Sequence, residues 1–172
     1  MKKALLVIDL QNDYLWEARN KKFSYKDVDR LVTNTNKQID KYHREDVEIV
    51  YIAQIIPNVW WGRRFFGFSI EGTEGAKLYS KLNVVSTNYF EKTFSDAFTN
   101  KKFVTFLMEK GINSVAICGI DEGGCVFATA RGALKHGLSV EMLTDSIDTC
   151  FPQIKVDKLR QELKRKGAKY IY

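Results

Sequence analysis

The chain has 172 residues, of which 45% are hydrophobic and 28% charged, a composition typical of a folded protein that buries a core without disulfides or metals. Two prolines and no glycine- or serine-rich tract argue against linkers, so residues 1–172 are predicted to form a single domain. No run approaches the roughly 20 apolar residues of a membrane span, and three irregularly spaced cysteines exclude a disulfide framework. The net charge of +6 is attributed to solvated helix faces, so no nucleic-acid partner is expected. Without a predicted membrane span or disulfide framework, the protein is expected to be cytoplasmic and to have no membrane partner.

Hydrophobic periodicity predicts strands that alternate with helices. The predicted elements are, in chain order, strand 4–8, helix 28–42, strand 47–56, strand 84–90, helix 101–110, strand 114–120, helix 125–136, strand 138–143, helix 153–166 and strand 168–172. Residues 57–75 are rich in aromatic residues and lack a clear period, and long loops of this kind are usually functional. The alternation predicts a three-layer αβα fold around a doubly wound, mainly parallel sheet of about six strands.

Reactive side chains follow several of the predicted strands. Asp9 ends the first strand, Lys92 follows the third, Cys125 follows the fourth and Asp145 follows the fifth. In open α/β sheets, ligands bind beyond the carboxyl ends of the strands. These four residues are therefore predicted to converge on one rim of the sheet.

Cys125 opens a predicted helix after a glycine-containing turn. A thiol at a helix N-terminus feels the positive end of the helix dipole, which favours the thiolate, and the nearby backbone N–H groups can bind an oxyanion. The alternative is a buried structural cysteine, a description that suits Cys118 in the middle of a predicted strand. The position alone leaves both interpretations open for Cys125.

A cysteine nucleophile needs a base, and neither histidine fits. His136 lies eleven residues along the same predicted helix, roughly 16 Å away at ~1.5 Å per residue, and His43 belongs to the opposite rim. Asp9 is the best carboxylate, because a charge at the end of a buried strand is costly unless it is paired or used. A simple turn-capping role for Asp9 is the alternative, and Lys92 is the natural countercharge.

Taken together, these segments resemble the isochorismatase-like cysteine hydrolase superfamily, which includes nicotinamidases and other small amidases. The segments occur in family order and are Leu5-Leu-Val-Ile-Asp-Leu-Gln-Asn-Asp-Tyr14, Glu91-Lys-Thr-Phe-Ser-Asp-Ala-Phe98, Gly119-Ile-Asp-Glu-Gly-Gly-Cys-Val-Phe-Ala-Thr-Ala-Arg-Gly-Ala133, Gly137 and Asp145-Ser146. These make four motifs in order over most of the chain, Gly137 and Asp145-Ser146 being counted as the fourth, and the resemblance is therefore specific.

The resemblance implies a catalytic triad of Asp9, Lys92 and Cys125, with no cofactor. Asp9 acts as the base, Lys92 orients and balances it, and Cys125 forms a thioester with an amide-type substrate. The family also implies a cis peptide bond between Ile120 and Asp121, which aims the backbone N–H groups of Asp121 and Cys125 at the oxyanion.

The chain departs from the family pattern near the nucleophile. Metal-binding nicotinamidases carry an Asp-x-His motif after the second strand, where this chain has Gln54-Ile-Ile-Pro-Asn58, so no metal is expected. Glu122, Gly124 and Asp96 replace the residues usual at their positions. They add negative charge and room, which favours a cationic or bulky substrate or raises the pKa of the thiol.

The substrate pocket is expected to involve Tyr14, Trp60, Trp61, Phe94 and Glu122. The aromatic residues between 60 and 68 fit a contact with a second subunit equally well, and a homodimer or homotetramer is expected.

Hydrolysis of a small amide-type C–N bond is the leading functional prediction, with a small molecule as the partner. The alternatives are an isochorismatase-type vinyl-ether hydrolase and a weakly catalytic binding or assembly member of the same fold. A nucleotide-binding domain is excluded because neither G-x-G-x-x-G nor G-x-x-x-x-G-K occurs.

Overall fold

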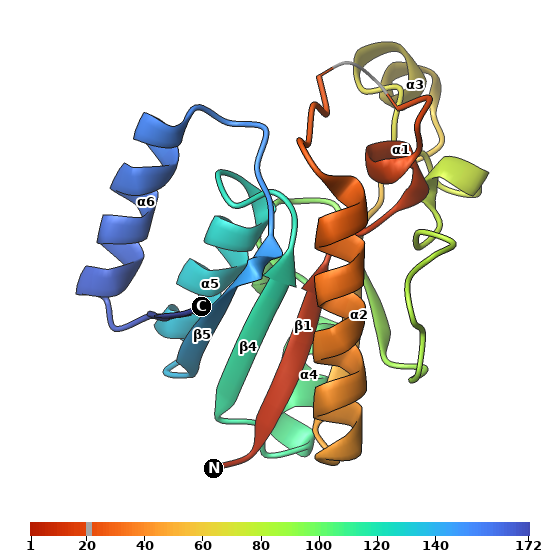
Figure 1. The fold of residues 1–172 in the computed structure, drawn as a ribbon. Coiled ribbons are helices and arrows are strands. Elements are labelled where there is room, and N and C mark those ends of the chain that lie inside the picture. The colour runs from red at the N-terminus through yellow and green to blue at the C-terminus, as the bar shows by residue number, and fades with distance from the viewer. Residues whose placement is uncertain (20–21) are drawn as a thin grey trace.

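A six-stranded sheet forms the centre of the computed structural model, which describes residues 1–19 and 22–172. All neighbouring strands run parallel, in the order β3-β2-β1-β4-β5-β6 (Figure 1). The strands are β1 (Lys3–Ile8), β2 (Glu48–Gln54), β3 (Tyr89–Lys92), β4 (Ser114–Gly119), β5 (Ser139–Ile147) and β6 (Lys169–Ile171). The predicted doubly wound parallel sheet is confirmed.

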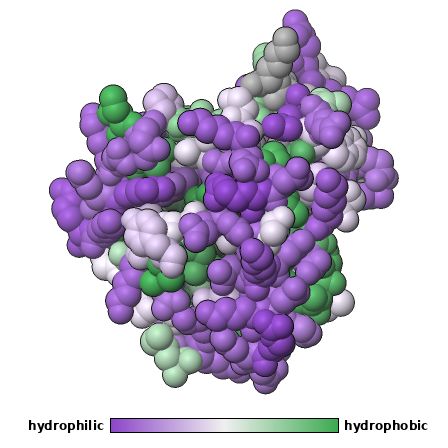
Figure 2. Space-filling model, in the orientation of Figure 1, coloured by the Kyte–Doolittle hydropathy of each residue, from purple (hydrophilic) through white to green (hydrophobic). Residues whose placement is uncertain are grey.

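Helices cover both faces of this sheet. They are α1 (Asn12–Leu15), α2 (Val28–Arg44), α3 (Trp60–Phe65), α4 (Lys101–Glu109), α5 (Cys125–Lys135) and α6 (Gln153–Arg165), with 3-10 turns η1 (Glu74–Ala76) and η2 (Ala97–Thr99). In Figure 1, α2 crosses in front of β1 while α4 and α5 lie behind the sheet. The face of the molecule seen in Figure 2 is mostly hydrophilic, with small separate hydrophobic areas.

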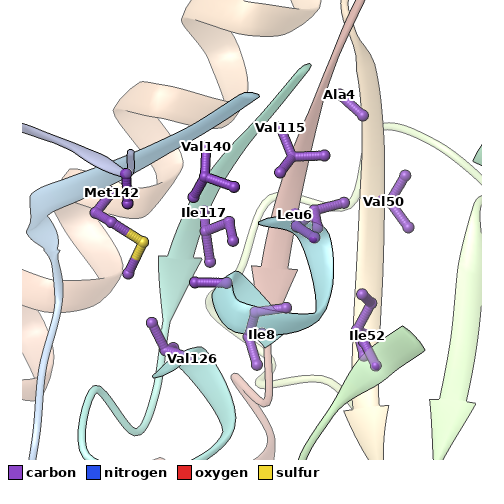
Figure 3. Close-up of a cluster of buried hydrophobic side chains, with 14 of the residues drawn as sticks. Ala4, Leu6, Ile8, Val50, Ile52, Val115, Ile117, Val126, Val140 and Met142 are labelled. Atoms are coloured by element: carbon purple, nitrogen blue, oxygen red, sulfur yellow. The ribbon is translucent and has the colours of Figure 1, made fainter. Parts of the chain in front are cut away.

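Two hydrophobic cores lie on opposite sides of the central strands. Alternate residues of β1 point to opposite faces, so Leu6 and Ile8 join the core under α4 and α5 while Leu5 and Val7 join the core under α2. Figure 3 shows the first core, where Val126 of α5 packs near the side chains of β1 and β4. Burial on both faces explains why these strands are continuous apolar runs.

The third strand is shorter and later than the predicted strand 84–90. The residues before β3 bond to β2 largely through a side chain: the Tyr51 hydroxyl donates to the Asn83 carbonyl at 2.8 Å and accepts from the Val85 N–H at 3.1 Å. The Tyr51 N–H also donates to the Asn88 carbonyl at 2.9 Å. A tyrosine hydroxyl thus replaces ladder bonds, and regular pairing begins only at Tyr89.

The carboxyl ends of β1 and β4 meet at the centre of the sheet, where the strand order reverses direction. A Cβ atom at Gly119 would lie 2.1 Å from the carbonyl oxygen of Ile8, and Gly119 has φ +112°, so only glycine allows this close approach. Ligands bind at such switch points in doubly wound sheets. Within the described residues, no helix is long and apolar enough to span a bilayer.

Candidate active site

Asp9 leaves β1 in a left-handed conformation, with φ +54°, and its N–H donates to the Ile52 carbonyl of β2 at 2.8 Å. Its carboxylate oxygen Oδ2 accepts a hydrogen bond from Nζ of Lys92 at 2.8 Å. Lys92 ends β3, two strands away, so its side chain extends along the rim past the end of β2. Both side chains are buried, which makes this an ion pair enclosed by protein.

Gln54 ends β2, between Asp9 and Lys92, and it contacts the same lysine. Its side-chain oxygen accepts a second hydrogen bond from Lys92 Nζ at 2.8 Å, and its side-chain nitrogen donates to the Thr93 carbonyl at 2.7 Å. The Gln11 side chain exchanges two hydrogen bonds with the Gln54 backbone, each 2.9 Å long. Gln54 is a residue of the site that the sequence analysis treated only as a departure from a metal motif.

Cys125 is the first residue of α5, and its thiol interacts electrostatically with the side chains of both Asp9 and Lys92. The structure therefore brings together the three residues of the predicted triad. Asp9 Oδ1 is buried and accepts from no N–H or O–H donor among the described residues. That oxygen is available for the proton of the thiol.

Electrostatics at the thiol differ from the expectation of a favoured thiolate. Burial and the adjacent Asp9 carboxylate raise the pKa of Cys125 to about 12, and they outweigh the opposing effect of Lys92. Burial alone would lower the pKa of Lys92, but the charges of Asp9 and Cys125 reverse this and raise it. Cys125 is thus a protonated thiol at neutral pH and needs a base to react.

The turn before Cys125 is held by Asp121. The peptide bond between Ile120 and Asp121 is cis. The Asp121 carboxylate accepts hydrogen bonds from Gly123 N–H at 2.8 Å, the Thr149 hydroxyl at 2.6 Å, and both the N–H and the thiol of Cys150, at 2.8 and 3.0 Å. With four donors, this carboxylate is engaged within the protein.

Glu122 and Asp145 lie away from the reactive groups. Both carboxylate oxygens of Glu122 pair with Arg160 of α6, at 2.6 and 2.7 Å, so the extra negative charge expected near the nucleophile is neutralised. Asp145 was expected at the rim, but β5 continues to Ile147 and leaves Asp145 exposed, its carbonyl bonded to Arg30 and Asn34.

A cavity of about 470 Å³ opens beside Cys125. Tyr14, Trp61 and Phe94 line it as expected, together with Asp9, Asp121 and Cys125. Two residues predicted for the pocket lie outside its lining: the Trp60 side chain is 76% exposed, and Glu122 pairs with Arg160. The sequence analysis missed several lining residues, which are Phe23, Tyr25, Gln54, Ile56, Pro57, Thr93, Ser95, Cys150 and Phe151.

The donor set does not suit a metal ion. Among residues 1–19 and 22–172, no three His, Cys, Asp or Glu side chains are grouped so as to hold one.

A buried carboxylate, ammonium and thiol at the switch point of a doubly wound sheet define an α/β protein equipped for nucleophilic chemistry. Comparison with known proteins gives the family: the isochorismatase domain model matches residues 3–171, and the chain therefore belongs to the isochorismatase family, a family of hydrolases.

Individual relatives are distant but match over nearly the whole chain. An uncharacterized isochorismatase family protein of Bacillus subtilis, YddQ, is 26% identical over 92% of this chain and 84% of its own length. The structure of the nicotinamidase/pyrazinamidase PncA from Bacillus subtilis has a TM-score of 0.86 at 23% identity and covers all of both chains. N-carbamoylsarcosine amidase from Thermoplasma acidophilum has a TM-score of 0.82 at 21% identity, covering 99% of this chain and 95% of its own.

Proposed function

We propose that this protein is a cysteine hydrolase that cleaves a small amide-type C–N bond. The observation that carries the proposal is the contact of the Cys125 thiol with Asp9 and Lys92 at one end of a cavity. The names of two structural neighbours, a nicotinamidase/pyrazinamidase and an N-carbamoylsarcosine amidase, support an amide-type substrate.

The first half of the reaction forms an acyl-enzyme. Asp9 Oδ1 takes the thiol proton while the sulfur of Cys125 attacks the carbonyl carbon, and this gives a tetrahedral oxyanion. The oxyanion is stabilised by the backbone N–H groups of Asp121 and Cys125, which donate to no acceptor within the described part of the chain. Asp9 then protonates the leaving nitrogen, the C–N bond breaks, and ammonia or an amine departs from the thioester.

The second half restores the enzyme. Asp9, again a carboxylate, removes a proton from water, which attacks the thioester carbonyl. The carboxylic acid departs and Asp9 returns the proton to the sulfur of Cys125. Lys92 balances the charge of Asp9 and of the thiolate as it forms, and Gln54 holds Lys92 from the opposite side.

Ammonia release from a panel of small amides, ureides and carbamoyl compounds tests the proposal. We expect turnover by the wild type and by Cys118→Ala, whose thiol is buried in β4, and none by Cys125→Ala. Turnover that survives in Cys125→Ala would exclude the thiol as nucleophile. Cleavage of a vinyl ether without ammonia release from any amide would replace the proposal by the vinyl-ether alternative.

A further inference from the structure

Aromatic rings form most of the cavity wall, and several of them pack against one another. Tyr14, Phe23 and Phe68 form a cluster in which the ring centroids lie 4.7 to 5.7 Å apart. The Tyr14 hydroxyl accepts a hydrogen bond from Ser69 at 2.9 Å, so its polar atom is engaged behind the wall. Trp61 and Phe94 come from other segments and extend the apolar wall. Rings packed edge to face in this way hold one another in place and give a substrate an apolar wall.

Two of the polar side chains in the cavity, Asp121 and Gln54, are engaged in bonds within the protein. Asp121 accepts four hydrogen bonds. The amide oxygen of Gln54 faces Lys92 and its nitrogen faces Thr93. Among the described lining residues, the groups that remain for a substrate are Asp9 Oδ1, the backbone N–H groups at Cys125 and the neutral hydroxyls of Thr93 and Ser95.

The cations near the cavity lie on its rings: Lys22 Nζ is 3.8 Å from the ring centroid of Phe68, and Lys155 Nζ is 3.3 Å from that of Phe151. None of the described residues that line it is a lysine, arginine or histidine. The side chain of Lys92 is fully buried, and Arg160 is committed to Glu122. A substrate carboxylate next to Cys125 would be desolvated beside Asp9 and Asp121 without a countercharge among the described lining residues, which is costly. A substrate cation would find only carboxylates that are already paired or bonded.

The volume sets the size of the group that is bound. At about 470 Å³ the cavity lies within the roughly 300–1,000 Å³ typical of sites for drug-sized ligands. At its rim Phe94 is 69% exposed and Phe151 37%, so an apolar group can extend outward between rings.

We infer that the substrates are uncharged amides whose acyl group is apolar and larger than a single aromatic ring, such as a fused bicyclic carboxamide. This inference rests on the proposed function, because it states which acyl groups the same site accepts. The bulky substrate anticipated from the sequence agrees with it, whereas the cationic one does not, because Glu122 is neutralised by Arg160.

A matched set of amides tests the inference. We expect kcat/KM for naphthalene-2-carboxamide to exceed that for 6-carboxynaphthalene-2-carboxamide by about 100-fold, because the added carboxylate has no countercharge among the described lining residues. Nicotinamide, with one polar ring, is expected to be poorer by about tenfold or more, because it leaves much of the wall uncovered. Equal or better kcat/KM for the carboxylate-bearing or the single-ring amide would overturn the inference while leaving the hydrolase proposal intact.

A binding measurement separates the inference from the chemistry. Calorimetry with Cys125→Ala is expected to show the same order of affinity for the three amides. Adding Phe94→Ala or Trp61→Ala should weaken binding of naphthalene-2-carboxamide by about tenfold, whereas Trp60→Ala, an exposed neighbour outside the cavity, should leave it unchanged. Preferential binding of that amide without turnover by the wild type would support the inference and refute the proposed function. Equal binding of all three amides, or equal effects of Trp60→Ala and Phe94→Ala, would refute the inference.

Discussion

The ammonium nitrogen of Lys92 lies 2.8 Å from the carboxylate oxygen Oδ2 of Asp9, and the two side chains are 0% and 4% exposed. The pair joins the ends of β1 and β3 around Gln54 of the strand between them. Each charge has lost most of its water and depends on the other. The pair should therefore affect the stability of the fold as well as the reactivity of the site.

Lys92→Met should destabilise the fold by about 3–5 kcal/mol, because it leaves the Asp9 carboxylate buried without a partner. The double variant Asp9→Leu with Lys92→Met removes both charges and should recover most of that loss, although it remains inactive. Urea unfolding of the wild type and these variants measures the effect. If the double variant is as unstable as Lys92→Met, the cost does not come from an unpaired charge.

Asp9→Asn should lower the pKa of Cys125 while abolishing turnover. In the wild type, burial and the charge of Asp9 raise this pKa to about 12, so removing the charge leaves the attraction of Lys92 to favour the thiolate. Alkylation of Cys125 by iodoacetamide should therefore become faster at mildly alkaline pH in Asp9→Asn than in the wild type.

Cys150 provides an internal control for that experiment. Burial and Asp121 raise the pKa of Cys150 to about 11, without a contribution from Asp9, so its alkylation profile should be the same in both proteins. Peptide mapping after alkylation resolves the two cysteines. A profile for Cys125 that stays in place, or moves to higher pH, would contradict the electrostatic role of Asp9.

Gln54→Leu tests whether Gln54 positions Lys92. The change removes one acceptor from Lys92 Nζ, so we expect kcat to fall by about tenfold, equivalent to about 1.4 kcal/mol. The alkaline limb of the alkylation profile of Cys125 should also shift, which a loss of stability alone would not cause. Gln161→Leu, on the exposed face of α6, is the matched control. Unchanged kcat and profile in Gln54→Leu would leave Gln54 with a purely structural role.

Arg160→Leu should destabilise the protein by about 3 kcal/mol, because Glu122 is 4% exposed and loses its bidentate partner. Adding Glu122→Gln should restore part of that stability, since the uncompensated charge is removed. Thermal unfolding of the two variants measures the difference. Equal melting temperatures for Arg160→Leu and the double variant would indicate that the ion pair is not what fixes this turn.

Much of the site was predictable because it depends on strand ends. Asp9 and Cys125 each follow a buried apolar run, and parallel strands bring such ends to one rim. The partners of the site were harder to predict because they depend on side-chain contacts between distant segments. Glu122 meets Arg160 from 38 positions away, and the Tyr51 hydroxyl displaces the start of β3, effects that no local pattern records.

The sequence left the direction of the thiol pKa shift open for a related reason. The helix start at Cys125 is visible in the sequence, but the burial that outweighs the helix dipole arises only when Asp9 and the aromatic wall close around the sulfur. Likewise Trp60 and Trp61 are adjacent residues of the same type, and the sequence does not distinguish them. Only the orientation of α3 places Trp61 in the cavity and Trp60 in solvent.

The most direct measurement is the mass of the enzyme quenched in acid during turnover of an amide substrate. The hydrolase mechanism predicts a species heavier by the acyl group, which is the substrate minus ammonia, located on Cys125 by peptide mapping and absent from Cys125→Ala. Steady ammonia release with an acyl adduct on another residue, or with full activity in Cys125→Ala, would contradict the role of Cys125 as nucleophile.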